Sequence, residues 1–522
     1  MCWDGQPPQR QGIAVTNTTD GVGSIESVAH GSYHLVVGDE LRAASNGNAR
    51  ATYDPSTGRP IVDVPQATPA DVHDAVHWAQ RAQPDWYELG VEGRIEQLGR
   101  LRDLVSAHQE ELSLLDSIDG GHPLRSMCAD VASAIWEMDV WPTVARLAGG
   151  KTMPASRGNL HYTLLMPYGV VGRILPFNHP AMFAIVGMLP PLLAGNTVVL
   201  KPAEQTPLSA LRLGELALEV LPPGVVNVVA GGADTGDAIV AHPAVKRIAF
   251  TGSEAIGRTV QRRGAEAGVK HITLELGGKN PMIVFPDADL ETVVEGAITG
   301  MNFGISGQSC NSNSRVLVHE NLHDEFVQRL ADRLEQIPLG VAYDEHTEMG
   351  PLVSEQQYQR VMGYVDSGRQ AGAKLVTGGG PPDDPALAGG YYLQPTAFTN
   401  VSPDMRIARD EIFGPVVSVF SWDDYEGMVA LANGVDLGLT ASVWTNDLHI
   451  AHKTAERLQA GYVWINGSSR HFWGMPFGGL KNSGLGREAS VEELMSYYEI
   501  KSVHTMLGDP RAAMDRLTGS EG

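Results

Sequence analysis

Two short motifs carry side chains that can perform covalent chemistry. Cys310 ends the run Gly307-Gln-Ser-Cys310, and Glu275 opens the run Glu275-Leu-Gly-Gly-Lys279, 35 positions upstream (310 − 275). A thiolate can attack an electrophilic carbon, and a separate carboxylate can activate the water that releases the product. Because a thiol ionises with an ordinary pKa of about 8.5, the protein must stabilise its thiolate form. The two motifs predict a reaction through a covalent acyl-enzyme.

The alternative for Cys310 is a structural role, since a free cysteine is usually a small buried hydrophobe. Its neighbours argue against packing in a core because they are small or polar: Gly304, Ser306, Gly307, Gln308, Ser309 and Asn311. No histidine lies within eight residues of it on either side. A histidine brought close by the fold would still allow a Cys-His arrangement, so that alternative stays open.

The elements that must position these motifs follow a regular alternation. Short apolar strands are predicted at 169–175, 197–200, 225–229 and 247–250, with helices at 180–194, 207–220, 234–241 and 254–267. This alternation is typical of a doubly wound parallel sheet, in which ligands bind beyond the carboxyl ends of the strands. Further α/β alternation runs from residue 281 to about 465, and residues 69–118 are predicted to be helical. We expect regular structure to begin near the turn at 54–58, after a loose extension over residues 1–35.

Two motifs at predicted strand ends suit a nucleotide. Gly252, Ser253 and Gly257 follow one strand and open a helix, where backbone N–H groups favour an anion. The spacing is not Gly-x-Gly-x-x-Gly, so a plain glycine-rich turn is about as good an interpretation. Lys201 and Glu204 follow another strand, at the place where ribose hydroxyls lie in dinucleotide-binding folds. The alternative for this pair is a solvated surface position.

Two further motifs suit a reacting centre. Asn178, in Pro176-Phe-Asn-His-Pro180, carries an amide that can donate to a developing oxyanion, although turn chemistry explains an Asn before His-Pro equally well. Glu411 and Phe413 are two residues apart, so on an extended segment both would face the same side. That arrangement would suit a ribose acceptor beside a ring on nicotinamide, and the alternative is the start of a strand.

Composition limits the class of protein. The chain has 522 residues, which suits two or three domains, and a net charge of −23, which argues against nucleic acid and anionic membranes as partners. Three cysteines without metal-type spacing favour a reducing compartment and no metal site. The N-terminus has no secretory apolar region, and the apolar stretch 181–195 is too short to span a bilayer. A cytoplasmic location is expected.

Taken in order, seven motifs are similar to those of the aldehyde dehydrogenase superfamily, over a match from about Tyr53 to His504. They are Pro176-Phe-Asn178, Lys201-Pro-Ala-Glu204, Gly252-Ser253 with Gly257, Glu275-Leu-Gly-Gly-Lys279, Gly307-Gln-Ser-Cys310, Glu411-Ile-Phe-Gly-Pro415 and Pro476-Phe-Gly-Gly479. Phe177, Ala203 and Asn311 depart from the commonest residues at their positions. None of these three removes a reacting group, so the departures bear on coenzyme preference and substrate fit.

The resemblance implies the role of each residue. Cys310 would attack the aldehyde, Asn178 would hold the oxyanion, and Glu275 would activate the hydrolytic water. The coenzyme would be NAD, with NADP as a second option. The residues implied to contact it are Ile174, Pro176, Phe177, Lys201, Glu204, Gly231, Phe250, Gly252, Ser253, Gly257, Leu276, Glu411 and Phe413.

The substrate residues are expected to come from three segments. His179, Met182, Phe183 and Val186 recur at helical spacing and share one face, which periodicity alone would pack against the sheet. The resemblance instead turns this face toward a substrate channel. Ser309 and Asn311 flank the nucleophile, and the segment 470–473 with His471 would form an opposite wall with Phe477. Arg470 would admit a carboxylated aldehyde if its side chain pointed inward.

The resemblance also implies a domain organisation. A dinucleotide-binding domain would span 36–148 and 167–277, a catalytic α/β domain 278–480, and a small β oligomerisation arm 149–166 and 490–510. The arm predicts a homodimer or homotetramer. Two other functions remain: a dehydrogenase that transfers the acyl group to coenzyme A, and a non-catalytic binding or structural protein on the same scaffold. Glu275 argues against the first, because a thiol acceptor needs a base less than water does.

Overall fold

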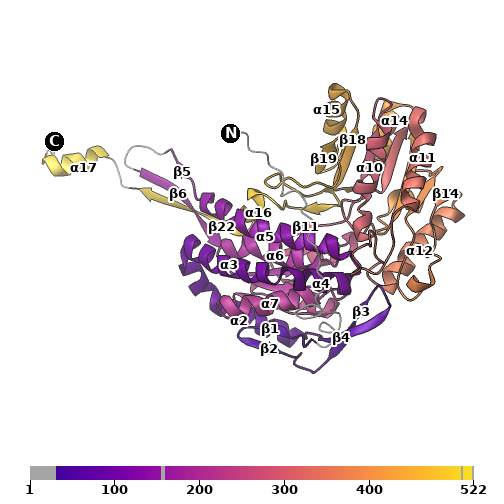
Figure 1. Cartoon of the computed structure of the whole chain (residues 1–522). Helices are drawn as coiled ribbons and strands as arrows, with labels where there is room; N and C mark the ends of the chain where they lie inside the picture. Colours follow the sequence, from indigo (N-terminus) through magenta and orange to yellow (C-terminus); the bar gives the residue numbers. More distant parts are fainter. Residues whose placement is uncertain (1–30, 155–158, 507–509, 520–522) are drawn as a thin grey trace.

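The computed structural model describes residues 31–154, 159–506 and 510–519, which form two large sheets, a projecting β arm and their covering helices (Figure 1). The first large sheet has strand order β2-β1-β9-β8-β7-β10-β11-β21. Its strands are β1 Leu35–Val37, β2 Glu40–Arg42, β7 Val170–Ile174, β8 Thr197–Lys201, β9 Val226–Val228, β10 Val245–Thr251, β11 His271–Glu275 and β21 Gly484–Leu485.

The order of the five central strands creates a switch point. From β7 the chain adds β8 and β9 on one side, and then returns to add β10 and β11 on the other, with every neighbour parallel. Loops that leave β7 and β10 therefore diverge, and a crevice opens between them at the carboxyl ends of the strands. β7 and β8 are buried along their whole length, because helices cover both faces of a sheet of this kind.

Several long helices, and the short helix α16 Val491–Met495, pack with this sheet around one apolar core. The long helices are α2 Pro69–Glu88, α3 Gly90–Ala107, α4 Gln109–Gly120, α5 Leu124–Leu147, α6 Pro180–Leu193, α7 Leu208–Val220, α8 Ala233–Ala241 and α9 Glu254–Ala267. Within the described ranges, no helix combines the length and apolar character that crossing a bilayer requires.

The second large sheet has strand order β14-β15-β16-β13-β12-β18-β19, and only its β14–β15 pair is antiparallel. Its strands are β12 Pro281–Val284, β13 Arg315–His319, β14 Lys374–Thr377, β15 Thr396–Thr399, β16 Val416–Trp422, β18 Thr440–Trp444 and β19 Tyr462–Ile465. Its helices are α10 Leu290–Met301, α11 Glu320–Glu335, α12 Glu355–Gln370, α13 Arg406–Arg409, α14 Tyr425–Asn433 and α15 Leu448–Arg457. Short elements complete this part: η1 Phe303–Ile305, η2 Pro385–Leu387, β17 Leu437–Gly438 and β20 Leu480–Lys481.

A three-stranded sheet projects away from the rest of the molecule (Figure 1). It contains β5 Thr152–Met153, β6 Asn159–Pro167 and β22 Tyr498–Met506, and the helix α17 Pro510–Thr518 follows it in the chain. β6 and β22 pair antiparallel from Tyr498 opposite Pro167 to Met506 opposite Asn159. Leu160, Leu164 and Ile500 expose apolar side chains on it. Residues 155–158 and 507–509 of the predicted arm lie outside the described residues.

The structure confirms the α/β fold class, and the predicted strands and helices between 169 and 267 lie within a few residues of their predicted bounds. The expected start of regular structure near Asp54 was wrong. β1 and β2 precede it, and Leu35, placed in the loose extension, is fully buried in β1 between β2 and β9. Three-residue strands carry too little alternation to be recognised. Residues 1–30 lie outside the described residues.

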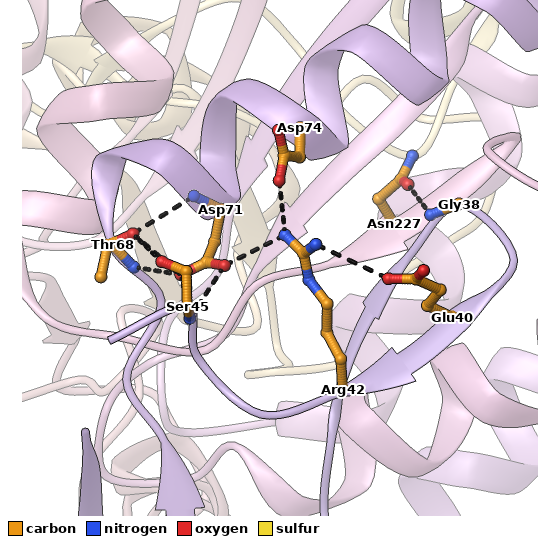
Figure 2. A network of polar contacts seen from close by, with 8 residues as sticks. All are labelled: Gly38, Glu40, Arg42, Ser45, Thr68, Asp71, Asp74 and Asn227. Carbon is orange, nitrogen blue, oxygen red and sulfur yellow. Dashed lines mark hydrogen bonds and ion pairs between the residues drawn. The ribbon is translucent and has the colours of Figure 1, made fainter. Parts of the chain in front are cut away.

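The start of α2 is held by a buried carboxylate (Figure 2). Asp71, with no exposed surface, accepts hydrogen bonds from the backbone N–H of Thr68 at 2.8 Å and of Ser45 at 3.1 Å. The Thr68 hydroxyl in turn accepts from the Asp71 backbone, which completes a capping box. Arg42, at the end of β2, pairs with Asp71 at 3.0 Å and with the exposed Asp74 at 2.9 Å. This network ties β2 and the 45–48 turn to the first turn of the helix.

We expect Asp71→Ala to destabilise the protein by about 3 kcal/mol, because it removes the one buried carboxylate that accepts from two backbone amides and pairs with Arg42. Asp74→Ala is the matched control. It removes the other carboxylate of the same arginine, but an exposed one, and should cost less than about 1 kcal/mol. The midpoint of thermal unfolding at one heating rate, with far-UV circular dichroism, measures both. Equal midpoints for the two variants would contradict the role given to Asp71.

Candidate active site

Two glycines form the crossing between the large sheets, and Glu411 and the Cys310 backbone lie against them. Gly277 and Gly278 lie between the end of β11 and the start of β12. A Cβ on Gly277 would lie 2.1 Å from Oε2 of Glu411, and a Cβ on Gly278 would lie 2.6 Å from the carbonyl oxygen of Cys310. Only residues without side chains allow these approaches. The crossing therefore brings the thiol loop and Glu411 up to the end of β11.

Cys310 lies in the loop between η1 and β13, and its backbone is fixed by Asn280. The Asn280 amide donates to the Cys310 carbonyl at 2.7 Å, while its oxygen accepts from the Thr440 backbone at 3.0 Å. Gly307 has a φ of +67°, and a Cβ there would lie 2.4 Å from the carbonyl oxygen of Gly414. Contacts with Asn280 and Gly414 thus hold the loop in place. Cys310 is partly exposed, and its Sγ lies 3.8 Å from the side-chain oxygen of Asn311.

The surroundings of Cys310 favour the neutral thiol over the thiolate. Burial raises its pKa well above the ordinary range, and the nearby carboxylates Glu411, Glu275 and Glu488 raise it further in that order. Each of these causes disfavours a negative charge on sulfur. A reactive thiolate at this position needs a positive charge or additional donors that arrive with a ligand.

Glu275 ends β11 as a buried carboxyl group without partners. It is 6% exposed, and neither oxygen accepts a hydrogen bond from any described residue. Burial raises its pKa well above the usual carboxyl range, Glu488 adds to this, and the charges of Arg487 and Arg173 oppose it. An unsatisfied buried carboxyl group is costly and marks a functional position. In its ionised form such a group can take a proton from a water molecule.

The positive charge of Arg173, a residue outside the motifs, acts on Glu275 and lowers its pKa. Arg173, in β7, is fully buried and pairs with Glu488 at 2.8 Å. A Cβ on Gly187 of α6 would lie 2.7 Å from Nε of Arg173, so the guanidinium occupies space that a side chain at 187 would fill. Sequence reasoning missed Arg173, because a charged residue within an apolar strand gives no sign of its partner.

Asn178 lies at the switch point between β7 and β10. Ile174 ends β7, Pro176 and Phe177 follow it, and His179 precedes the first turn of α6. The Asn178 side chain is almost buried, at 3% exposure, and makes no hydrogen bond with any described residue. Its amide is therefore free to donate to a ligand.

The loop after β10 leads into a helix whose first backbone amides are not capped by a side chain. Ser253 precedes the 14-residue helix α9, yet its hydroxyl does not cap the helix, so the first amides of the helix are free. A Cβ on Gly252 would lie 2.6 Å from the Phe250 ring, and one on Gly257 would lie 2.6 Å from Leu276. The two glycines therefore let the loop and the helix approach the sheet closely enough for a phosphate to reach the backbone.

Lys201 and Glu204 lie together beyond β8. Lys201 is 7% exposed, and burial lowers its pKa to about 8, opposed by the charge of Glu204. Glu204 forms an ion pair with Arg50 of the strand β3, at 3.0 Å. Nearby, a Cβ on Gly231 would lie 2.1 Å from the hydroxyl of Thr235, so this position has no room for a side chain. Arg50 was missed because it lies far upstream in a two-stranded hairpin, β3 Ala49–Asp54 with β4 Arg59–Pro65.

The prediction that Glu411 and Phe413 share one side of an extended segment was wrong in its backbone. Phe413 adopts a left-handed conformation, with φ of +59°, and Gln357 donates to its carbonyl at 2.7 Å. The Glu411 side chain still faces the crossing. Glu411 accepts from the Gly278 backbone at 2.9 Å, and burial raises its pKa to about 7. The Phe413 ring meets Phe177 edge to face at 5.5 Å.

The segment expected to form one wall of a substrate mouth, next to Cys310, is the less buried face of α6. Met182, Phe183 and Val186 are half-buried, whereas Ala184, Ile185 and other residues of the opposite face are fully buried in the core. The face with His179 is therefore not the one packed most deeply against the sheet. His179 pairs with Asp130 of α5 at 2.6 Å, and the charge of Asp130 holds its pKa above the ordinary histidine value against the effect of burial.

The other wall consists of the nucleophile's neighbours and the 470–477 segment. The Asn311 amide lies 2.7 Å from Nε2 of His471, and the His471 ring lies 4.7 Å from that of Phe477. Ser309 accepts from the Asn311 backbone at 3.3 Å. Arg470 stacks over the exposed ring of Phe472, at 5.3 Å. The structure thus joins Asn311, His471 and Phe477 beside Cys310.

A model of the aldehyde dehydrogenase family matches residues 42–503 of the chain. Aldehyde dehydrogenase tropH of Talaromyces stipitatus is 41% identical over 476 residues, which cover 90% of this chain and 92% of that protein. Betaine aldehyde dehydrogenase 1 of Rhizobium meliloti is 41% identical over 482 residues, covering 92% of this chain and 98% of its own.

Solved structures agree with the sequence relatives. The NAD+ complex of an aldehyde dehydrogenase from Bacillus cereus superposes with a TM-score of 0.89 at 38% identity, covering 93% of this chain and 98% of that one. A betaine aldehyde dehydrogenase from Staphylococcus aureus, also solved with NAD+, gives a TM-score of 0.90 at 34% identity, covering 93% and 97%. With the fold, the motifs and these relatives in agreement over nine-tenths of its length, the chain belongs to the aldehyde dehydrogenase family.

Proposed function

We propose that this protein oxidises an aldehyde to the carboxylic acid with NAD+, through a thiohemiacetal and a thioester on Cys310. The observation that supports the proposal is the glycine crossing after β11. Gly278 lies against the Cys310 backbone, and Glu275, three residues before Gly278, is a buried carboxyl group without partners whose charge acts on the thiol. A binding protein has no use for a buried carboxyl group that is left without partners.

The residues at the crevice fit the coenzyme. We propose that the free amides and Ser253 at the start of α9 hold the pyrophosphate, and that Lys201 and Glu204 hold the adenosine ribose. Ile174, Pro176 and Phe177 would line the crevice, with Glu411 and Phe413 on the nicotinamide side. When bound, NAD+ supplies the hydride acceptor and a positive charge near the thiol. NAD+ is expected over NADP+, because Glu204 repels a 2′-phosphate.

The chain's own residues carry the covalent steps. Cys310, as thiolate, attacks the aldehyde carbon, and Asn178 with the Cys310 backbone N–H donates to the oxyanion. When the oxyanion collapses, the carbon gives up its hydrogen as hydride and a thioester remains on sulfur. Glu275 then removes a proton from water, which attacks the thioester and frees the thiolate. The balance is one aldehyde, one NAD+ and one water converted to one acid, one NADH and one proton.

The walls of the mouth suggest the substrate class. We propose a medium-sized apolar or aromatic aldehyde, which would lie between Met182 and Phe183 on one side and Phe477 on the other. His179, His471 and Asn311 add polar groups at the edge. The exposed stacking of Arg470 on Phe472 leaves the mouth without an inward arginine from this segment for a carboxylated aldehyde.

We expect Cys310→Ser to abolish NADH formation while NAD+ binding is kept, because a hydroxyl is far less acidic than a thiol and has no adjacent base. Glu275→Gln should keep a burst of one NADH per site and lose steady turnover, because only the hydrolytic step needs the base. Stopped-flow absorbance of NADH measures both, with and without coenzyme A.

Cys128→Ser is the matched control, since it changes a free cysteine outside the site and should keep normal turnover. Turnover above a few per cent in Cys310→Ser would refute the nucleophile. Loss of the burst in Glu275→Gln would mean that the carboxyl group acts before hydrolysis. Turnover that needs coenzyme A would replace hydrolysis with acyl transfer.

The mouth predicts that hexanal and benzaldehyde have higher kcat/KM values than acetaldehyde and succinic semialdehyde. Phe183→Ala should lower kcat/KM for benzaldehyde more than for acetaldehyde, because only the larger substrate reaches this ring. Steady-state kinetics with the four aldehydes decide it. The interpretation of the pocket is wrong if acetaldehyde or the semialdehyde is preferred tenfold, about 1.4 kcal/mol of transition-state discrimination.

We propose further that residues 149–166 and 490–510 act as an oligomerisation arm beside a coenzyme domain (36–148 and 167–277) and a catalytic domain (278–480). β5 and β22 lie at the edges of their three-stranded sheet, and unpaired edges with apolar side chains favour association. Each subunit would then contribute the same surface to a closed dimer or a dimer of dimers.

Sedimentation should therefore show a dimer or tetramer rather than a 55.9 kDa monomer. Ile500→Asp should weaken the assembly, because it places a charge on an exposed apolar position of β22. Glu499→Gln, on the opposite face of the same strand, is the control and should leave the assembly unchanged. A wild-type monomer at micromolar concentration would contradict the proposal.

A further inference from the structure

Arg50 reaches the predicted ribose site from outside the large sheets. It lies in β3, opposite Val64 of β4. The end of the hairpin nearest Arg50 is hydrogen-bonded to the loop after β9. There the Ala67 backbone donates to the Ala230 carbonyl at 2.8 Å. The anchored hairpin places the guanidinium 3.0 Å from Oε2 of Glu204, the carboxylate at the end of the coenzyme crevice.

The ion pair is exposed enough to open. The Arg50 side chain is 54% exposed and that of Glu204 is 33% exposed. Such pairs contribute little to stability, since water solvates both charges when they separate. Among the described residues Arg50 has no other ion pair, so nothing else holds the guanidinium in place.

Lys201, the other cation at this place, is poorly suited to a new anion. It is 7% exposed, its ammonium donates to the Pro202 carbonyl at 3.1 Å, and burial lowers its pKa to about 8. Arg50, in contrast, keeps its charge at every relevant pH and carries a planar set of donors that matches a phosphate. The exposed permanent cation beside Glu204 is therefore Arg50.

We propose that Arg50 is a coenzyme-specificity residue that binds a 2′-phosphate on the adenosine ribose, so that the site accepts NADP+ as well as NAD+. The inference rests on the proposed function, because it takes the crevice as the coenzyme site. With NAD+, Glu204 accepts from the ribose hydroxyls while Arg50 remains its partner. With NADP+, the guanidinium turns from the carboxylate to the phosphate and offsets the repulsion by Glu204.

Binding of two adenosine fragments to the full chain tests this without any turnover. Isothermal titration calorimetry compares 5′-AMP with adenosine 2′,5′-bisphosphate, which differ only in the 2′-phosphate. Arg50→Ala should raise the ratio of the bisphosphate Kd to the AMP Kd by about tenfold, and Arg50→Lys by less. Arg59→Ala, an exposed arginine at the other end of β4, should leave the ratio unchanged.

A second background separates direct contact from an effect through Glu204. In Glu204→Gln, adding Arg50→Ala should still weaken the bisphosphate relative to AMP, because the phosphate contact remains to be lost. An unchanged ratio in either background overturns the inference. If the wild type reduces NAD+ with aldehydes but the ratio of the bisphosphate Kd to the AMP Kd is the same with and without Arg50, the inference alone fails. If neither fragment nor NAD+ binds, the proposed function fails with it.

Discussion

The absence of two side chains between β11 and β12 is the constraint on which the site depends. Gly277 and Gly278 let a carboxylate and the thiol loop approach one backbone from two sides, at distances where any Cβ would collide. Around this crossing the other contacts are local: Asn280 holds the Cys310 carbonyl, and Glu411 accepts from Gly278. The catalytic groups are thus set by backbone contacts between sheets rather than by the rotamers of long side chains, which favours a fixed geometry.

The surroundings of this crossing raise the pKa of both Glu275 and Cys310. Glu275 is buried without partners, and the pKa of the Cys310 thiol is raised by burial and three carboxylates. Burial disfavours the charged form of each group, and it raises the pKa of both. A ligand with a cationic ring beside the thiol would reverse the sign of the local field. In the mechanism proposed above, the reactivity of the thiol is therefore coupled to coenzyme binding.

The sequence predicted the fold class and the placement of the motifs, because both depend on patterns that are local in the chain. The strands before Asn178, Glu204 and Ser253 could be recognised from their apolar runs, and the motifs then followed at strand ends. The left-handed backbone of Phe413 and the three-residue strand at Leu35 could not, since neither has a periodic signal. Pairs such as Arg50–Glu204, Arg173–Glu488 and His179–Asp130 join residues far apart in sequence, and only the tertiary fold decides which charges meet.

The last part of the chain completes a site whose other parts are made much earlier. β21 adds to the edge of β11 at Glu275, and Glu488, which pairs with Arg173, follows it. Further on, the Tyr497 carbonyl accepts a hydrogen bond from the Asn196 amide, and β22 pairs antiparallel with β6. During synthesis the chain emerges from its N-terminus, so Cys310 leaves the ribosome before the strand and the carboxylate that complete the surroundings of Glu275. A nascent chain that has not yet added β21 and Glu488 therefore holds Cys310 without these surroundings of Glu275.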